Sequence, residues 1–124
     1  MNMKFWMVFL GGGIGSIIRF GFQYYMPNTN SLSVPTLSAN ILSCLILGYL
    51  AGLKMRAQIS DESYLLLATG FCGGFSTFST LVLENWQAIR IGKIGIALFY
   101  ALLSLTLGFL SLIFGYFLSQ KYQH

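Results

Sequence analysis

Charged side chains are so few in this chain, and so placed, that they leave four long apolar runs between them. Of the 124 residues, 56% are hydrophobic and 8% are charged, whereas a soluble domain carries about 25% charged residues. A chain this short cannot bury that much apolar surface in a core of its own. A bilayer core about 30 Å thick is crossed by roughly 20 helical residues. The sequence therefore predicts an all-α integral membrane protein in the lipid bilayer.

The charges and turn signals divide the chain into four expected spans. They run from about Phe5 to Tyr25, Thr36 to Leu53, Ser63 to Ala88 and Ile94 to Gln120. A turn-rich segment at residues 27–31 separates the first two. We interpret the first run as a retained span rather than a signal peptide, because no clear cleavage site follows it. The whole of residues 1–124 is expected to form one four-span domain.

The basic residues read as membrane anchors and not as a nucleic-acid-binding patch. The net charge of +4 comes from seven basic residues that, Arg19 apart, flank the apolar runs. With an even number of spans, one side of the membrane would hold Lys4, Lys54, Arg56 and Lys121, and the other Arg90 and Lys93. Arg19 lies near the second side too. So small a bias would let the chain insert in both orientations, and pairing of the two orientations would give an antiparallel dimer.

Residues 70–80, with the sequence GFCGGFSTFST, lie in the middle of the third run. Glycine costs roughly 1 kcal/mol per residue in a helix interior, so three glycines in five residues predict a break between two half-helices. Broken backbone at membrane depth is tolerated where it is buried in protein or lines a wet cavity. The stretch therefore predicts a site for a polar or ionic species. Carbonyls freed by the break could coordinate a cation such as sodium, and the second half-helix would favour an anion at its N-terminus.

Three polar residues within the runs are candidates for that site. Arg19 could attract an anion into a vestibule, or it could cap a neighbouring helix end. Asn40 could donate to a desolvated anion, which we favour, or hydrogen-bond between helices. Glu84 follows the break, and we interpret it as a carboxylate that stabilises the dipole of the second half-helix.

Aromatic and hydroxyl side chains offer a second set of candidates. Phe75 and Phe78 flank two hydroxyl residues at the break, and their positive ring edges could face an anion. Such weak binding would allow the release that conduction requires; the alternative is core packing. Tyr100 and Ser104 lie four residues apart and so share one face of the fourth span.

Small residues recur at the spacing at which membrane helices pack closely. Gly11 and Gly15 lie four residues apart, as do Gly48 and Gly52. Four helices of this size enclose little interior volume, so a transport pathway is expected to need a second copy of the chain. We therefore expect an oligomer, most simply a dimer.

The residues do not favour enzyme chemistry. Cys44 and Cys72 lie in apolar runs without metal or redox spacing and read as small buried hydrophobes. The only histidine is His124, and the three carboxylates form no dyad. A phosphate-binding loop is also missing from the sequence.

Three motifs taken together resemble those of one known family. Residues 11–20 resemble its signature GGxxGxxxR[YF], residues 36–40 its TLxxN element, and residues 70–80 its long break motif GFCGGxTTFST. On these motifs the chain is identified as a member of the small fluoride channel family, also called CrcB or Fluc. The resemblance covers all four runs in order.

This resemblance implies a dual-topology antiparallel homodimer with two fluoride pores, which passively exports fluoride from the cytoplasm across a bacterial inner membrane. It also implies a sodium ion at the dimer centre, held by the backbone carbonyls of Gly73 and Ser76 of both subunits. The motif positions assign a fluoride-pore role to Asn40, Phe78, Thr77, Ser79, Thr80, Tyr100, Ser104 and Arg19, with Phe75 as a further candidate.

One departure from the family pattern bears on the pore. Leu81 stands where the family usually has a second pore phenylalanine, and leucine has no positive ring edge. Such a chain could be the non-conducting partner in a heterodimer of two divergent chains, or a homodimer whose pores tolerate leucine. Two other functional classes stay open. One is a proton-coupled small multidrug exporter, which would need a carboxylate in the first span, where this chain has Arg19. The other is a structural subunit without a transport role.

Overall fold

The computed structural model describes residues 2–27 and 32–122. Within these ranges the protein is all-helical, with four helices long and apolar enough to cross a membrane. The elements are α1 (Met3–Tyr25), α2 (Val34–Met55), α3 (Asp61–Tyr64), η1 (Leu65–Cys72), α4 (Gly73–Phe75), α5 (Phe78–Arg90) and α6 (Ile94–Lys121). The four expected spans are therefore confirmed. Most of the turn expected at residues 27–31 lies outside the described ranges.

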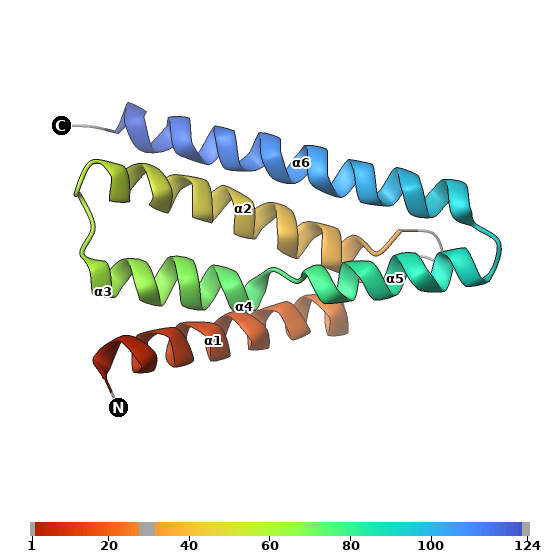
Figure 1. Ribbon diagram of the computed structural model, residues 1–124, viewed down its shortest axis with the longest axis horizontal. Helices are drawn as coiled ribbons and strands as arrows, with labels where there is room; N and C mark the ends of the chain where they lie inside the picture. The colour runs from red at the N-terminus through yellow and green to blue at the C-terminus, as the bar shows by residue number, and fades with distance from the viewer. Residues whose placement is uncertain (1, 28–31, 123–124) are drawn as a thin grey trace.

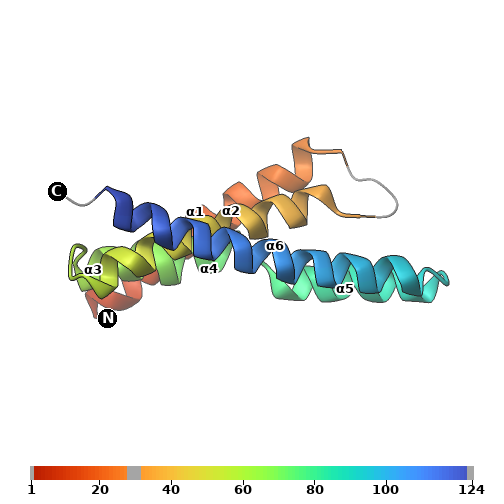
Figure 2. The same cartoon turned by 90° about the horizontal axis from the view of Figure 1, so that it is seen from above.

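Consecutive spans run antiparallel, so both ends of the chain lie at the same end of the bundle (Figure 1). The third span consists of α3, η1, α4 and α5 in succession, with α1 against its first half and α2 between it and α6. Figure 2 shows that α5 and α6 continue together and diverge from the end of α1 and the start of α2. The break between α4 and α5 thus lies where the bundle divides into two arms.

Glycines let the helix backbones touch at the expected positions. A Cβ on Gly11 would lie 2.8 Å from the backbone nitrogen of Phe71, and a Cβ on Gly15 would lie 2.8 Å from that of Phe75. On the other side of the bundle, a Cβ on Gly48 would lie 2.8 Å from the carbonyl carbon of Leu112. Real side chains do not fit at such distances, so these glycines fix how closely the spans pack.

The break is present, but it does not lie at the glycines as the sequence predicted. Gly73 is helical (φ −64°, ψ −35°), whereas Ser76 (φ −79°, ψ 156°) and Thr77 (φ −151°, ψ 116°) are extended. The glycines serve close packing instead, because a Cβ on Gly74 would lie 3.0 Å from the Cα of Gly12. Glycine is needed at these positions for its small size and not for its freedom of φ.

Candidate ion site at the break of the third span

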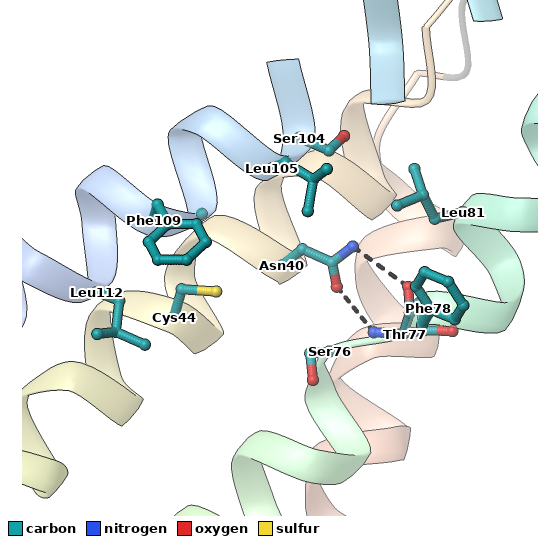
Figure 3. Close-up of a pocket in the computed structure, with 11 residues that line it drawn as sticks. Asn40, Cys44, Ser76, Thr77, Phe78, Leu81, Ser104, Leu105, Phe109 and Leu112 are labelled. Atoms are coloured by element: carbon teal, nitrogen blue, oxygen red, sulfur yellow. Dashed lines mark hydrogen bonds between the residues drawn. The ribbon is translucent and has the colours of Figure 1, made fainter. Parts of the chain in front are cut away.

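Asn40 on α2 hydrogen-bonds both backbone groups of Thr77, an extended residue at the break. Its Oδ1 accepts a hydrogen bond of 2.8 Å from the backbone N–H of Thr77, and its Nδ2 donates one of 3.3 Å to the carbonyl of Thr77 (Figure 3). A backbone break at membrane depth leaves polar groups that must find partners within the protein. The Asn40 side chain thus replaces two hydrogen bonds that a continuous helix would have supplied.

Other side chains satisfy the carbonyls on the α4 side of the break. The Cys72 carbonyl accepts from Ser43 Oγ at 2.9 Å and from Ser76 Oγ at 2.7 Å. The Gly74 carbonyl accepts from Arg19 Nε at 2.9 Å. Arg19 therefore caps the end of the first half of the third span, which is the second of the two roles considered from the sequence.

The carbonyl oxygens of Gly73 and Ser76 lose their usual helical donors at the break. In a continuous helix they would accept from the N–H groups four residues later. Here the Thr77 N–H turns to Asn40, and the Thr80 N–H bonds the Thr77 side-chain oxygen at 3.2 Å. The donors are thus diverted from both carbonyls that the family resemblance implicates in sodium binding. Carbonyl oxygens are suitable ligands for such a hard cation.

A pocket of about 340 Å³ opens beside the break. Its polar lining comes from α2, the break and α6, and its apolar lining from α5 and α6 (Figure 3). The lining residues are Asn40, Cys44, Ser76, Thr77, Phe78, Leu81, Ser104, Leu105, Gly108, Phe109 and Leu112. No carboxylate is among them. The wall is mostly apolar, and its few uncharged donors lie at the N-terminal end of α5, where an anion would be favoured over a cation.

Ser104 contributes a hydroxyl that the single chain leaves unused. The residue is 8% exposed, and its Oγ is buried without a hydrogen-bond partner among the described residues. An unsatisfied buried hydroxyl costs about 1–3 kcal/mol. Because Ser104 also lines the pocket, its unpaired hydroxyl is a candidate donor to a ligand there.

Beyond the pocket, a buried cluster gathers around Glu84. Thr36 Oγ1 donates to Glu84 Oε1 at 2.6 Å, and the Tyr100 hydroxyl donates to Glu84 Oε2 at 2.9 Å. Ser33 Oγ adds a further hydrogen bond to the cluster by donating to Thr36 Oγ1 at 3.0 Å. The dipole role expected for Glu84 is wrong, because it is the seventh residue of α5 and lies beyond the first turn. The cluster instead joins α2, α5 and α6.

The structure separates the remaining candidates from one another. Phe75 is 3% exposed and packs its ring against Phe22 and Phe71 at centroid distances of 5.2 and 5.5 Å. It does not line the pocket, so the alternative of core packing holds. Phe78, by contrast, lines the pocket and is 77% exposed.

The hydroxyls that follow the break form a cap and not a pocket wall. Thr77 Oγ1 donates to Thr80 Oγ1 at 3.0 Å and lies 3.4 Å from Ser79 Oγ. Of these three residues only Thr77 lines the pocket, and Tyr100 also lies outside its lining. Ser79 and Thr80 therefore contact Thr77 and do not line the pocket.

Sequence reasoning missed several residues of the pocket. Cys44, Leu105, Phe109 and Leu112 line it without having been singled out for this role. Helical spacing could have predicted Cys44, because it lies four residues after Asn40 and so shares a helix face with it. Their apolar side chains carried no chemical signal of their own.

These features define a multi-pass membrane protein with a candidate ion site at the break of its third span. The chain belongs to the family described as CrcB-like protein, Camphor Resistance (CrcB), whose model matches residues 6–116. It is 35% identical to a protein of Azobacteroides pseudotrichonymphae named Fluoride-specific ion channel FluC, over 97% of this chain and 98% of that protein.

Two further relatives carry the same name. The protein of Bacteroides fragilis is 34% identical over 94% of this chain and 95% of its own length. The protein of Gloeothece citriformis is 38% identical over 93% and 95%. This family is one of ion channels and not of enzymes. Membership of this chain in the family does not support the hypothesis of a multidrug exporter.

Proposed function

We propose that this protein is a fluoride-selective channel that exports fluoride passively from the cytoplasm. The observation that carries the proposal is the pocket at the break, where Asn40, the α5 N-terminus and an unpartnered Ser104 hydroxyl meet without a carboxylate. The names of the relatives support it. Fluoride is small and strongly hydrated, so a pore must replace its water with donors while binding it weakly enough for release.

The donors for fluoride come from a small set of uncharged groups. Asn40 Nδ2 has two hydrogens and offers one of them to Thr77, so the second is available to an ion in the pocket. Ser104 Oγ has no partner within the described chain. The Phe78 ring borders the same space and can present its positive edge. Together they can replace part of a hydration shell without trapping the anion behind a full positive charge.

The working assembly is proposed to be an antiparallel homodimer with two pores. The pocket of one chain is open, with Phe78 77% exposed beside it, so a second copy is needed to enclose an ion path. The small charge bias across the membrane allows the two orientations that such a dimer requires. A heterodimer with a second family chain is the alternative that Leu81 raises.

A structural sodium ion is proposed at the centre of this dimer. The ligands would be the Gly73 and Ser76 carbonyls of both copies, whose usual helical N–H donors bond elsewhere at the break. Sodium would supply a positive charge between the two broken spans. Within this chain, Asn40 and the Thr77 hydroxyl hold the neighbouring N–H groups away from those oxygens.

The proposed location is the inner membrane of a bacterial cell, as a multi-pass protein. Four apolar membrane-length helices support a multi-pass arrangement. The basic residues at the ends of the spans fit lipid headgroups, and we assign the protein no nucleic-acid partner.

Fluoride efflux from liposomes that contain the purified chain alone tests this function. A fluoride electrode should record rapid release down the gradient without a proton gradient, and a chloride electrode should record none. Replacing sodium with a large organic cation on both sides should abolish release if the sodium site is structural. Equal fluoride and chloride release would contradict selectivity, and no release from folded dimers would point to a missing second chain.

A further inference from the structure

Cys44 on α2 brings a free thiol to the wall of the pocket at the break. It lies one helical turn after Asn40, so the two side chains share a helix face. Figure 3 shows the Cys44 sulfur directed toward the space that Asn40 and Ser76 also border. The residue is half-buried, so its thiol belongs to the pocket wall and not to the closed interior that the sequence suggested.

The helix opposite Cys44 presents bare backbone at the same level. Gly108 on α6 lines the pocket, and a Cβ built on it would lie 3.5 Å from Cys44 Sγ, at ordinary van der Waals distance. Gly108 lies four residues after Ser104, on the same face of α6. The sulfur therefore lies between α2 and α6, and an atom bonded to it would take up space in the pocket between these helices.

A second observation indicates that this pocket takes a ligand. Ser104 is 8% exposed, and its buried Oγ has no hydrogen-bond partner among the described residues. A buried hydroxyl without a partner costs about 1–3 kcal/mol, so a ligand that bonds it would remove a penalty that the chain alone carries. The pocket volume of about 340 Å³ falls within the range of about 300–1,000 Å³ that is typical of small-molecule sites.

The other free cysteine, Cys72, provides a contrast within the same chain. It is 2% exposed and is not part of the pocket lining. Thiols bind soft metal ions in preference to hard ones. Among the described residues, no group of three or more His, Cys, Asp or Glu side chains is placed to hold a metal ion. A soft metal that enters the pocket would thus meet one strong ligand, the Cys44 sulfur.

We propose that Cys44 is a soft-metal site within the fluoride path, and that a metal bound there closes the pore. Mercuric chloride suits the site because it is small and uncharged, and so is not repelled by the N-terminal end of α5 as a cation would be. The Cys44 S–H bond and one Hg–Cl bond break, an S–Hg bond forms, and the proton and one chloride leave to water without any change of oxidation state. This inference rests on the proposed channel function, and it adds a site of inhibition at a residue outside the family motifs.

Treatment of the full chain in liposomes with mercuric chloride tests the site. Fluoride efflux of the parent, Cys44→Ala and Cys72→Ala is recorded before and after treatment, and each treated rate is divided by the untreated rate of the same protein. Intact-mass spectrometry of the two variants follows the labelling of the one thiol that each retains. A small dithiol, which removes mercury from thiols, is then added. Cys72→Ala is the matched control, because it keeps the pocket thiol and removes the buried one.

We expect efflux of the parent and of Cys72→Ala to fall about tenfold once about nine-tenths of the pocket thiols are labelled, because each adduct obstructs the pore that its own chain lines. The dithiol should restore both rates. Efflux of Cys44→Ala should stay within about twofold of its untreated rate, because a buried thiol such as that of Cys72 is inert.

Undiminished efflux from labelled Cys72→Ala would overturn the inference, as would failure of its thiol to react. A block that persists in Cys44→Ala, or that the dithiol does not reverse, would also overturn it. Failure of the untreated parent to release fluoride would instead refute the proposed function. In that case labelling of Cys44 no faster than that of Cys72 would still overturn the metal site.

Discussion

Substitution of Asn40 separates its role in holding the break from its role as a donor to the ion. Asn40→Leu removes both hydrogen bonds to Thr77, of 2.8 and 3.3 Å. Each backbone group left unpaired costs about 1–3 kcal/mol, and the 3.3 Å bond is the weaker of the two. The expected loss of unfolding free energy is therefore about 2–4 kcal/mol.

Asn40→Asp changes the balance between the two roles. The aspartate can still accept from the Thr77 N–H, but its second oxygen faces the Thr77 carbonyl without a proton to donate. The shorter hydrogen bond is kept, but the other carboxylate oxygen lies against the Thr77 carbonyl oxygen, so we expect a stability loss at least as large as that of Asn40→Leu. Fluoride efflux should fall more steeply than in Asn40→Leu, because the carboxylate also repels the anion.

Denaturant titration of detergent-solubilised dimers, combined with electrode-recorded efflux, measures both effects. Gln87→Leu serves as the control, because its exposed amide lies away from the pocket. The reasoning would be refuted by a stability loss below about 0.5 kcal/mol for Asn40→Leu, the range of ordinary surface substitutions. Undiminished efflux in folded Asn40→Asp would refute the assignment of Asn40 to the pore.

Three further predictions follow from the packing, the cluster and the pocket. Gly74→Ala should destabilise the protein by about 1–3 kcal/mol or more, because its Cβ would lie 3.0 Å from the Cα of Gly12. Gly73→Ala should be tolerated, because nothing lies within 4 Å of a Cβ at that position. Thermal unfolding compares the two variants, and equal effects would contradict the packing argument. In a double-mutant cycle, the effects of Glu84→Gln and Tyr100→Phe on the free energy of unfolding should be non-additive by about 0.5–3 kcal/mol, because the two side chains share a hydrogen bond of 2.9 Å. Additive effects would mean that this hydrogen bond does not stabilise the protein. Leu81→Phe should preserve or raise fluoride efflux, because it adds a ring to the pocket wall; a marked loss in a folded dimer, measured with the same electrode, would show that the wall requires leucine.

The four spans could be predicted from the sequence because charge and apolar length alone determine where a chain can cross a bilayer. The expected limits of the fourth span, Ile94 to Gln120, differ from those of α6 by one residue. The existence of the break was also predictable, from the glycines and hydroxyls of residues 70–80.

The exact position of the break was not predictable, because glycine has two uses that a single sequence does not distinguish. Gly70 and Gly74 read as helix breakers, yet both are helical and lie against α1. The role of Glu84 was missed for a similar reason, since its partners Thr36 and Tyr100 come from other spans. Such long-range pairings require the packed structure.

Some of the predicted site residues line the pocket, and others do not. Asn40, Thr77, Phe78 and Ser104 meet in one pocket, as their polar or aromatic character suggested. Phe75 differs only in the face of the third span on which it lies, and its ring is buried beside Phe71. The residue type was therefore informative, but the helix face decided which of the two phenylalanines lines the pocket.

The most direct test of the account is fluoride efflux from liposomes that hold this chain alone, with chloride as the matched ion. The account predicts rapid fluoride release without chloride release, sustained without a proton gradient and lost when Asn40 becomes aspartate. Chloride release at a comparable rate, or fluoride release that survives Asn40→Asp unchanged, would contradict a selective pore built around the pocket at the break.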